Sequence, residues 1–413
     1  MERDIYLEQL IRKMNNGMIK VITGIRRSGK TYLLFKLFYK YLKSEGIEES
    51  NIIKIALDDR RNIELRNPDK LYEYLVSNIS SEGKYFVLLD EVQMVDEFED
   101  VLNSMLHIDN VDVYVTGSNA KFLSKDIITE FRGRGDQIHI FPLSFSEFYQ
   151  NFEGDKYDAW LEYSMYGGLP KLVSIKNNAD KASYLKNIVT ETYLKDILER
   201  NDVRNPKELE ELLSIIASGI GGLVNPKKIL DTFKRVKGVS IHHSTVSDYL
   251  TYFEDSFLIS RADRYNVKGR KYISTPCKYY FSDLGLRNAS LNFRQYEETH
   301  IIENIVYNEL LIRGYNVDVG VVDYFVNDEN SKSIRKSAEV DFVCNAAPNR
   351  IYIQVAYDLP TEEKMKQERT SLEKINDDFK KIIIVKNSPT YYTDDGILIL
   401  NLFEFLLDKD SLL

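Results

Sequence analysis

Cysteine and histidine are scarce in this chain, which has two cysteines and five histidines among 413 residues. Two cysteines cannot build a disulfide framework, and no paired CxxC spacing predicts a zinc site. The first ten residues, MERDIYLEQL, are charged where a secretory signal is apolar, and no uncharged run approaches the roughly 20 residues that cross a bilayer. We therefore expect a cytoplasmic protein with no membrane partner.

An excess of positive charge is also missing, because the formal net charge is −9. An acidic chain does not coat nucleic acid uniformly, although a local basic face remains compatible with this balance. Hydrophobic residues make up 43% of the sequence and aromatic residues 12%, which is enough to fill more than one core. The composition predicts a globular protein of several domains.

Apolar runs alternate with helical segments between residues 19 and 120. The runs IKVIT, NIIKIAL, YFVLLD and DVYVT are separated by amphipathic stretches such as YLLFKLFYKYLK. This rhythm is typical of βαβ units around a parallel sheet. We predict an α/β fold with a parallel-sheet core over residues 1–150.

The segment GIRRSGKT, residues 24–31, follows the first apolar run and precedes a helical stretch. It fits the phosphate-loop pattern GxxxxGK[ST], in which glycines let successive N–H groups point at phosphate oxygens. The lysine of such a loop reaches the β and γ phosphates, and the threonine hydroxyl binds Mg²⁺. The residues predicted to bind ATP are Gly24, Arg27, Ser28, Gly29, Lys30 and Thr31, and Thr31 is also a predicted Mg²⁺ ligand.

Polar residues end two later strands of the same predicted sheet. Asp90 and Glu91 follow YFVLLD, and we predict that Asp90 holds Mg²⁺ while Glu91 polarises the attacking water. Ser118 and Asn119 follow DVYVT, at the edge where parallel strands present ligands, and are candidates to sense the γ-phosphate. Arg134 lies in a glycine-flanked loop and is the candidate arginine that neutralises transition-state charge, in its own site or a neighbour's.

Helical segments follow the sheet, and we predict a helical lid region over residues 151–205. Residues 206–290 contain three helical segments and then the strand-like RADRYN and KYIS around the turn VKGR, which predicts a winged helix-turn-helix. Between residues 226 and 271, ten lysines and arginines stand against five acidic residues. This region is therefore locally basic in an acidic chain.

Two interpretations of the winged helix remain open. In one, it binds duplex DNA, with side chains of its last helix in the major groove and the turn on phosphates. The DNA-contact candidates are His243, Ser244, Ser247, Lys268 and Arg270. In the other, the module packs against the ATP-binding core or docks a protein client.

The last segment, residues 291–413, carries part of the PD-(D/E)xK pattern of metal-dependent nucleases. Glu303 on a helix and Asp341 on a strand fit the first two carboxylates, but the third strand, IYIQVAY, has Gln354 and Ala356 where a carboxylate and a lysine belong. An amide is a poor ligand for a hard cation, and alanine cannot activate water. We predict a degenerate nuclease-like domain used for binding, with an active nuclease as the alternative.

The motifs GIRRSGKT, LLDEVQ, VTGSN, GR before IFPLSFSEF, and MYGGLP together resemble the prokaryotic AAA-type ATPases. Members of this group have a P-loop core, a winged-helix region and a C-terminal restriction-endonuclease-like domain of unknown function, in that order, and the resemblance implies the same three parts here. The resemblance spans nearly the whole chain and implies ATP and Mg²⁺ as cofactors.

From the motifs and the resemblance we predict an ATPase whose nucleotide state rearranges the other domains on a DNA or protein client. One alternative is a regulatory or defence switch that binds a protein partner with little hydrolysis. A third is an ATP-gated DNA nuclease. The oligomeric state is left open.

Overall fold

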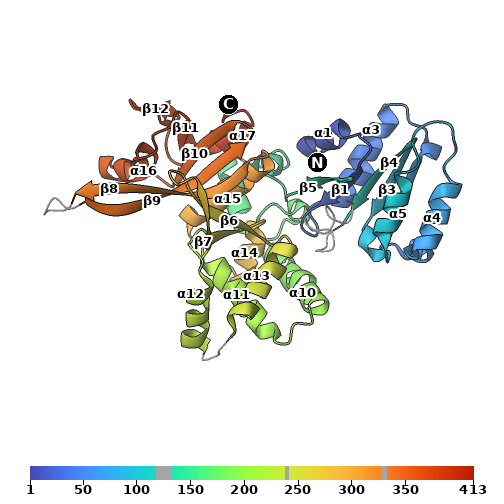
Figure 1. Cartoon of the computed structure of the whole chain (residues 1–413), viewed down its shortest axis with the longest axis horizontal. Helices are drawn as coiled ribbons and strands as arrows, with labels where there is room; N and C mark the ends of the chain where they lie inside the picture. Colours follow the sequence, from blue (N-terminus) through green and yellow to red (C-terminus); the bar gives the residue numbers. More distant parts are fainter. Residues whose placement is uncertain (118–132, 238–240, 328–332) are drawn as a thin grey trace. The chain divides into compact units, whose positions relative to one another are not determined.

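The computed structural model describes residues 1–117, 133–237, 241–327 and 333–413 (Figure 1). The chain forms two compact units. The first comprises Met1–Pro142, Leu169–Lys171 and Asp255–Phe257, and the second comprises Leu143–Gly168, Leu172–Glu254 and Leu258–Leu413. In the parts of the chain that the structure describes, no helix is both long and apolar enough to span a bilayer.

The first unit is built on a five-stranded sheet with the order β2-β3-β4-β1-β5, in which every neighbouring pair is parallel. Its strands are β1 (Ile19–Thr23), β2 (Ile52–Ala56), β3 (Tyr85–Asp90), β4 (Val111–Thr116) and β5 (Gly135–His139). Its helices are α1 (Asp4–Arg12), α2 (Lys30–Tyr32), α3 (Tyr39–Ser44), α4 (Pro68–Ser77) and α5 (Phe98–Met105). A π-helical segment, Leu33–Phe38, joins α2 to α3.

Both faces of this sheet are buried, as the nearly continuous apolar strands predict. Val87 on β3 packs in a core with α4 and α5, whereas its neighbour Leu88 packs in a second core with α1 and α3. Figure 1 shows these two helix pairs on opposite sides of the strands. The parallel α/β core predicted from the sequence is confirmed, and its carboxyl edge presents the loops that follow β1 and β3.

The second unit contains helices followed by an eight-stranded mixed sheet. Its helices before the sheet are α7 (Phe145–Tyr149), α8 (Lys156–Tyr166), α9 (Asn178–Asn187), α10 (Lys195–Arg200), α11 (Pro206–Ser218), α12 (Pro226–Thr232) and α13 (His243–Asp255). The strands are β6 (Ile259–Asn266), β7 (Lys271–Phe281), β8 (Asn316–Asn327), β9 (Ser333–Ala346), β10 (Asn349–Ala356), β11 (Lys380–Val385), β12 (Tyr391–Tyr392) and β13 (Leu398–Asn401). The remaining helices are α14 (Leu284–Ser290), α15 (Glu298–Ile312), α16 (Glu362–Glu373) and α17 (Leu402–Leu407).

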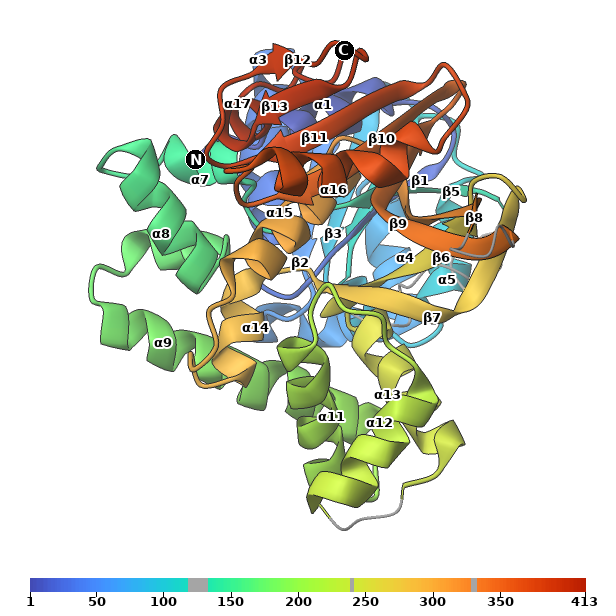
Figure 2. The ribbon, with the colours of Figure 1, turned by 90° about the vertical axis from the view of Figure 1, so that its left-hand side faces the viewer.

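The sheet of the second unit has the order β12-β13-β11-β10-β9-β8-β6-β7. Figure 2 shows α11, α12 and α13 grouped next to its β7 end, and α16 beside β10 and β11. The hairpin of β6 and β7 was expected to complete a separate winged helix over 206–290, yet β6 pairs with β8 in parallel. The sheet therefore runs across the predicted domain boundary at residue 290, and the winged-helix assignment itself stays a prediction.

Candidate functional site: a phosphate loop and a lysine–carboxylate cluster

The loop between β1 and α2 has the backbone shape that the phosphate-loop motif requires. Gly24 and Gly29 have φ values of 137° and 100°, a region that glycine adopts without the penalty of other residues. A Cβ added to Gly24 would lie 2.2 Å from the backbone oxygen of Ile140. Only glycine therefore fits at position 24, and the loop curls at the carboxyl edge of the parallel sheet.

The side chain of Lys30 lies inside this loop. Its side chain is buried, and Nζ donates hydrogen bonds of 3.0 Å to the carbonyl oxygens of Gly24 and Ile25. Burial lowers the pKa of Lys30 to about 8, although the nearby Glu91 and Asp90 act in the opposite direction. The two carbonyls accept hydrogen bonds from the ammonium group. Because they carry no net charge, the ammonium can still attract an anion.

Thr31 and Asp90, the two predicted Mg²⁺ ligands, are in direct contact. Thr31 Oγ1 donates to Asp90 Oδ2 at 2.8 Å, and Thr116 Oγ1 donates to the other carboxylate oxygen. Asp90 is buried, and burial raises its pKa while the two hydroxyls oppose that shift. A hydroxyl and a carboxylate held together in this way are oxygen ligands suited to Mg²⁺.

Glu91 begins the turn after β3 with φ of 54°, an uncommon conformation for a residue with a side chain. Its N–H donates to Thr116 Oγ1 at 3.1 Å, and its carboxylate accepts from Gln93 Nε2. Backbone strain of this kind is frequent at functional positions. The structure thus places Glu91 beside Asp90, at the edge of the sheet that carries the loop.

Three other residues were predicted to contact the nucleotide: Ser118, Asn119 and Arg134. Ser118 and Asn119 lie outside the described residues. Arg134 immediately precedes β5, and Ile19 pairs with Gly135 at the amino ends of β1 and β5. The loop leaves the opposite end of β1, about 13 Å away at 3.3 Å per residue, which is beyond the reach of an arginine side chain. The structure therefore does not support Arg134 in its own site, and a role in a neighbour's site stays a prediction.

Arg3 is a residue at this site that no motif indicates. It is 3% exposed, and its guanidinium donates to the backbone oxygens of Ser28 at 3.1 Å and Phe141 at 2.7 Å. The guanidinium also lies 4.6 Å from the ring centroid of Tyr6, whose hydroxyl accepts from the Phe141 N–H at 3.2 Å. The segment before and within α1 thus fastens the phosphate loop to the chain that follows β5.

We predict that Arg3→Ala weakens ATP binding about tenfold, because the loop loses the charge-assisted hydrogen bond to its Ser28 carbonyl and the link through Arg3 to Phe141. Arg3→Lys should recover part of the loss. Calorimetric titration of ATP measures the effect, with Arg12→Ala, at an exposed arginine in the last turn of α1, as the matched control. Equal affinities for the Arg3→Ala and Arg12→Ala proteins would contradict a role for Arg3 in shaping the loop.

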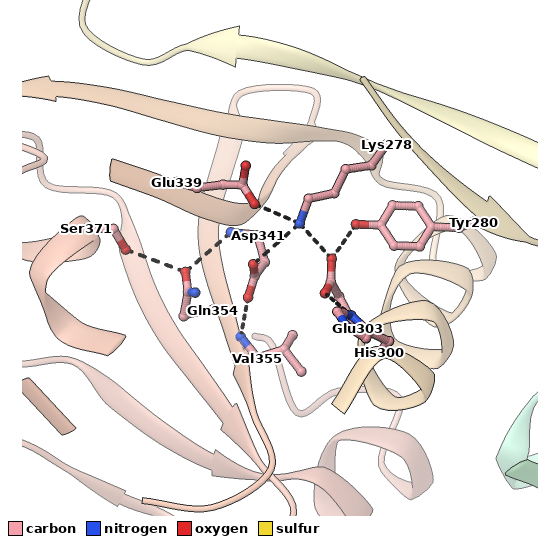
Figure 3. Close-up of polar contacts among 9 residues, drawn as sticks. All are labelled: Lys278, Tyr280, His300, Glu303, Glu339, Asp341, Gln354, Val355 and Ser371. Atoms are coloured by element: carbon pink, nitrogen blue, oxygen red, sulfur yellow. Dashed lines mark hydrogen bonds and ion pairs between the residues drawn. The ribbon is translucent and has the colours of Figure 1, made fainter. Parts of the chain in front are cut away.

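In the second unit, β7, β9 and α15 bring three carboxylates around one lysine (Figure 3). Lys278 Nζ on β7 lies 2.9 Å from Glu303 Oε1, 2.8 Å from Glu339 Oε1 and 3.8 Å from Asp341 Oδ1. Lys278 is almost completely buried. The structure therefore brings Glu303 and Asp341 together as predicted, but with an ammonium between them that the sequence pattern does not reveal.

The side chain of Gln354, the residue at the predicted position of the third carboxylate, lies beside Asp341. Its Oε1 accepts from the Asp341 N–H at 3.3 Å and from Ser371 Oγ at 3.5 Å (Figure 3). The second oxygen of Asp341 accepts from the Val355 N–H at 2.8 Å. Among the described residues, no group of three or more histidine, cysteine, aspartate and glutamate side chains is arranged to hold a metal ion.

The electrostatics of the cluster favour a fixed ammonium. Burial on its own would lower the pKa of Lys278, but Glu303, Asp341 and Glu339 raise it above its usual range. Burial and the neighbouring Glu303 raise the pKa of Asp341 well above its usual range. Tyr280 adds a hydrogen bond of 2.6 Å to Glu303 Oε1. Lys278 thus neutralises carboxylates that a nuclease would use to bind its cation.

Replacing Lys278 with methionine should lower the free energy of unfolding by about 3–5 kcal/mol, because buried carboxylates are left without a cation. The loss should shrink at acidic pH, where the carboxylates take up protons. Lys271→Met, at an exposed lysine on the same strand, is the control. Chemical denaturation curves that coincide for the two variants would contradict this account.

The candidate DNA contacts lie on two elements of the second unit. His243 and Ser244 are exposed in the first turn of α13, whereas Ser247 Oγ donates to the His243 carbonyl at 3.1 Å within the same helix. Lys268 and Arg270 are exposed in the turn between β6 and β7. Exposure leaves all but Ser247 available to a partner, and their binding of DNA stays a prediction.

Comparison with known proteins agrees with the phosphate loop. Residues 16–149 match a family described as an AAA domain, residues 157–297 match a domain of unknown function (DUF8612), and residues 298–405 match another (DUF4143). Together with the parallel sheet and the loop geometry, the first match defines an AAA-type P-loop protein.

Full-length relatives place the chain within this family. An uncharacterized protein of Haemophilus influenzae is 33% identical over 411 residues, covering 98% of each chain. An uncharacterized protein of Methanocaldococcus jannaschii is 32% identical over 411 residues, covering 95% of this chain and 85% of its own. The chain belongs to the same family as these two proteins, and its own residues 16–149 match the AAA domain. Among solved structures, the Aeropyrum pernix ORC1 protein in complex with DNA is similar at 12% identity and a TM-score of 0.33, covering 70% of this chain and 92% of its own.

Proposed function

We propose that this protein binds ATP with Mg²⁺ at the phosphate loop and hydrolyses it. The contact between Thr31 and Asp90, next to the buried Lys30, is the observation that carries the proposal. These residue types fit the ligand, since an ammonium and loop N–H groups suit phosphate oxygens, and a hydroxyl with a carboxylate suits Mg²⁺. Bound Mg²⁺ would supply charge neutralisation at the β and γ phosphates.

In this proposal each protein group has one task. Lys30 leaves the carbonyls of Gly24 and Ile25 and turns to the phosphates, which offer it a full negative charge. Asp90 and Thr31 orient the metal, and Glu91 holds the attacking water and draws off its proton. Glu91 is released for this from its contact with Gln93.

Two short segments of the first unit are continuous in sequence with the second unit. In the first unit, a Cβ on Gly29 would lie 3.8 Å from Pro170 Cγ, and the ring of Phe257 lies 4.6 Å from that of His139. Pro170 and Phe257 belong to short segments whose flanking residues are part of the second unit. We propose that these segments transmit the nucleotide state of the phosphate loop to the second unit and so to a DNA or protein client that the second unit binds.

The remaining alternatives differ in support. A switch with little hydrolysis uses the same loop, so the turnover of the wild-type protein decides between it and an ATPase. An ATP-gated nuclease finds no support in the cluster, because Lys278 neutralises Glu303 and Asp341, and the Gln354 oxygen is engaged by Asp341 and Ser371.

Glu91→Gln tests the assignment directly. The amide cannot accept a proton, so turnover should fall by a factor of about 10² to 10⁴ while ATP affinity changes little. Steady-state phosphate release and nucleotide titration measure the two quantities.

The matched control is Glu97→Gln, since Glu97 is an exposed glutamate of the same region that also has a positive φ, 52°. Its turnover should equal that of the wild type. Full turnover by the Glu91→Gln protein would remove Glu91 from the reaction, and equal loss in both variants would point to a structural effect of the region.

A further inference from the structure

A hollow in the second unit collects positive charge. It is lined by the turn between β6 and β7, the turn between β9 and β10, and the segment before β11, and its charged residues are Lys268, Arg270, Arg350 and Asp377. In the described part of the chain, Lys268 and Arg270 form no ion pair, and both are exposed. The single carboxylate, Asp377, already accepts a hydrogen bond of 2.6 Å from the Tyr352 hydroxyl. The lining therefore carries an unbalanced positive charge in a chain of net charge −9.

Aromatic rings stand beside these cations. The guanidinium of Arg350 lies 5.3 Å from the ring centroid of Tyr265 and 5.6 Å from that of Phe379. Arg350 Nε donates to Asn345 Oδ1 at 2.8 Å, which fixes the plane of the guanidinium. Phe379 is 41% exposed. An exposed ring next to a fixed guanidinium is a surface on which a nucleic-acid base stacks.

The turn that carries Lys268 and Arg270 is held in place. The Gly269 N–H donates to Asn266 Oδ1 at 2.6 Å, and Asn266 Nδ2 donates to Asp323 Oδ2 on β8 at 2.8 Å. The Val267 N–H donates to the Val321 carbonyl at 2.9 Å. The two cations are therefore presented by a backbone that is already ordered, so binding an anion costs little conformational entropy in the turn.

We propose that this hollow binds a single-stranded segment of DNA or RNA, with phosphates on Lys268 and Arg270 and a base on Phe379. The exposed ring favours a single strand, because a duplex keeps its bases stacked on each other and offers no free base face. This surface differs from the major-groove contact predicted for His243, Ser244 and Ser247 on α13. This inference rests on the proposed function, because it names a single strand as the client of the ATPase. Binding of the strand to the hollow does not itself require ATP.

Fluorescence anisotropy with the full chain tests the proposal. The probes are a 15-nucleotide mixed-sequence DNA strand, the same sequence as RNA, and the corresponding DNA duplex, each across a series of salt concentrations. Either single strand should bind more tightly than the duplex, and comparison of the two strands identifies the natural sugar.

The variants address each part of the surface. Lys268→Glu with Arg270→Glu should weaken single-strand binding at least tenfold and lower the slope of log affinity against log salt by about 1.4, at about 0.7 per phosphate contact. Phe379→Ala should weaken it about tenfold with little change in slope. The control, Lys176→Glu with Lys207→Glu, alters two exposed lysines of the same unit outside the hollow and should bind within about threefold of wild type.

Two kinds of result would overturn the proposal. One is the absence of single-strand binding, or equal losses in the hollow variants and the control. The other is preferential duplex binding that His243→Ala with Ser244→Ala abolishes. ATP turnover of the same proteins separates the two proposals: turnover without single-strand binding removes this inference alone, and single-strand binding without turnover removes the ATPase alone.

Discussion

A buried ammonium group must find oxygen partners inside the protein, and both candidate sites of this chain are arranged around that constraint. Lys30 donates to two neutral carbonyls of its own loop, and Lys278 is paired with three carboxylates from two segments of chain, α15 and β9. These oxygen partners determine whether each lysine can bind a further anion. Burial lowers the pKa of Lys30 to about 8 and Glu91 and Asp90 offset only part of that shift, so an anion that approaches the ammonium is attracted. Around Lys278, by contrast, Glu303, Asp341 and Glu339 raise the pKa and keep the ammonium charged and paired.

The same contrast explains the organisation of the two units. Lys30 can exchange its carbonyl partners for phosphates, which makes the loop a site whose state changes. Lys278 acts as a fixed link between β7, which lies in the segment expected to form a winged helix, and β9 and α15, which lie in the segment expected to resemble a nuclease. In this sheet the ammonium of Lys278 occupies the space between Glu303, Glu339 and Asp341 and is paired with them.

Contiguous patterns were readable from the sequence, and contacts between distant segments were not. GIRRSGKT and YFVLLDE lie at the carboxyl ends of β1 and β3, two parallel strands of one sheet with β4 between them, so the meeting of Thr31 and Asp90 at that edge follows from the topology. Arg3 and Lys278 reach their sites from other parts of the chain, and no spacing marks them. Gln354 and Ala356 predict a departure from the nuclease pattern, but no spacing indicates that Lys278 of β7 pairs with Glu303 and Asp341. For Arg134, the sequence of the loop does not show at which edge of the sheet it lies, and its role in a neighbour's site stays a prediction.

The pH dependence of ATP binding tests the central claim, that the buried Lys30 ammonium receives the phosphates. Below its pKa of about 8 Lys30 is charged, and above it the charge is lost, so calorimetric titration of ATP with Mg²⁺ should show affinity about tenfold weaker at pH 9 than at pH 7. ATP itself keeps its full charge over most of this range. Lys30→Met should bind weakly at both values. Equal affinity of the wild type at pH 7 and pH 9, or undiminished binding by Lys30→Met, would contradict the account.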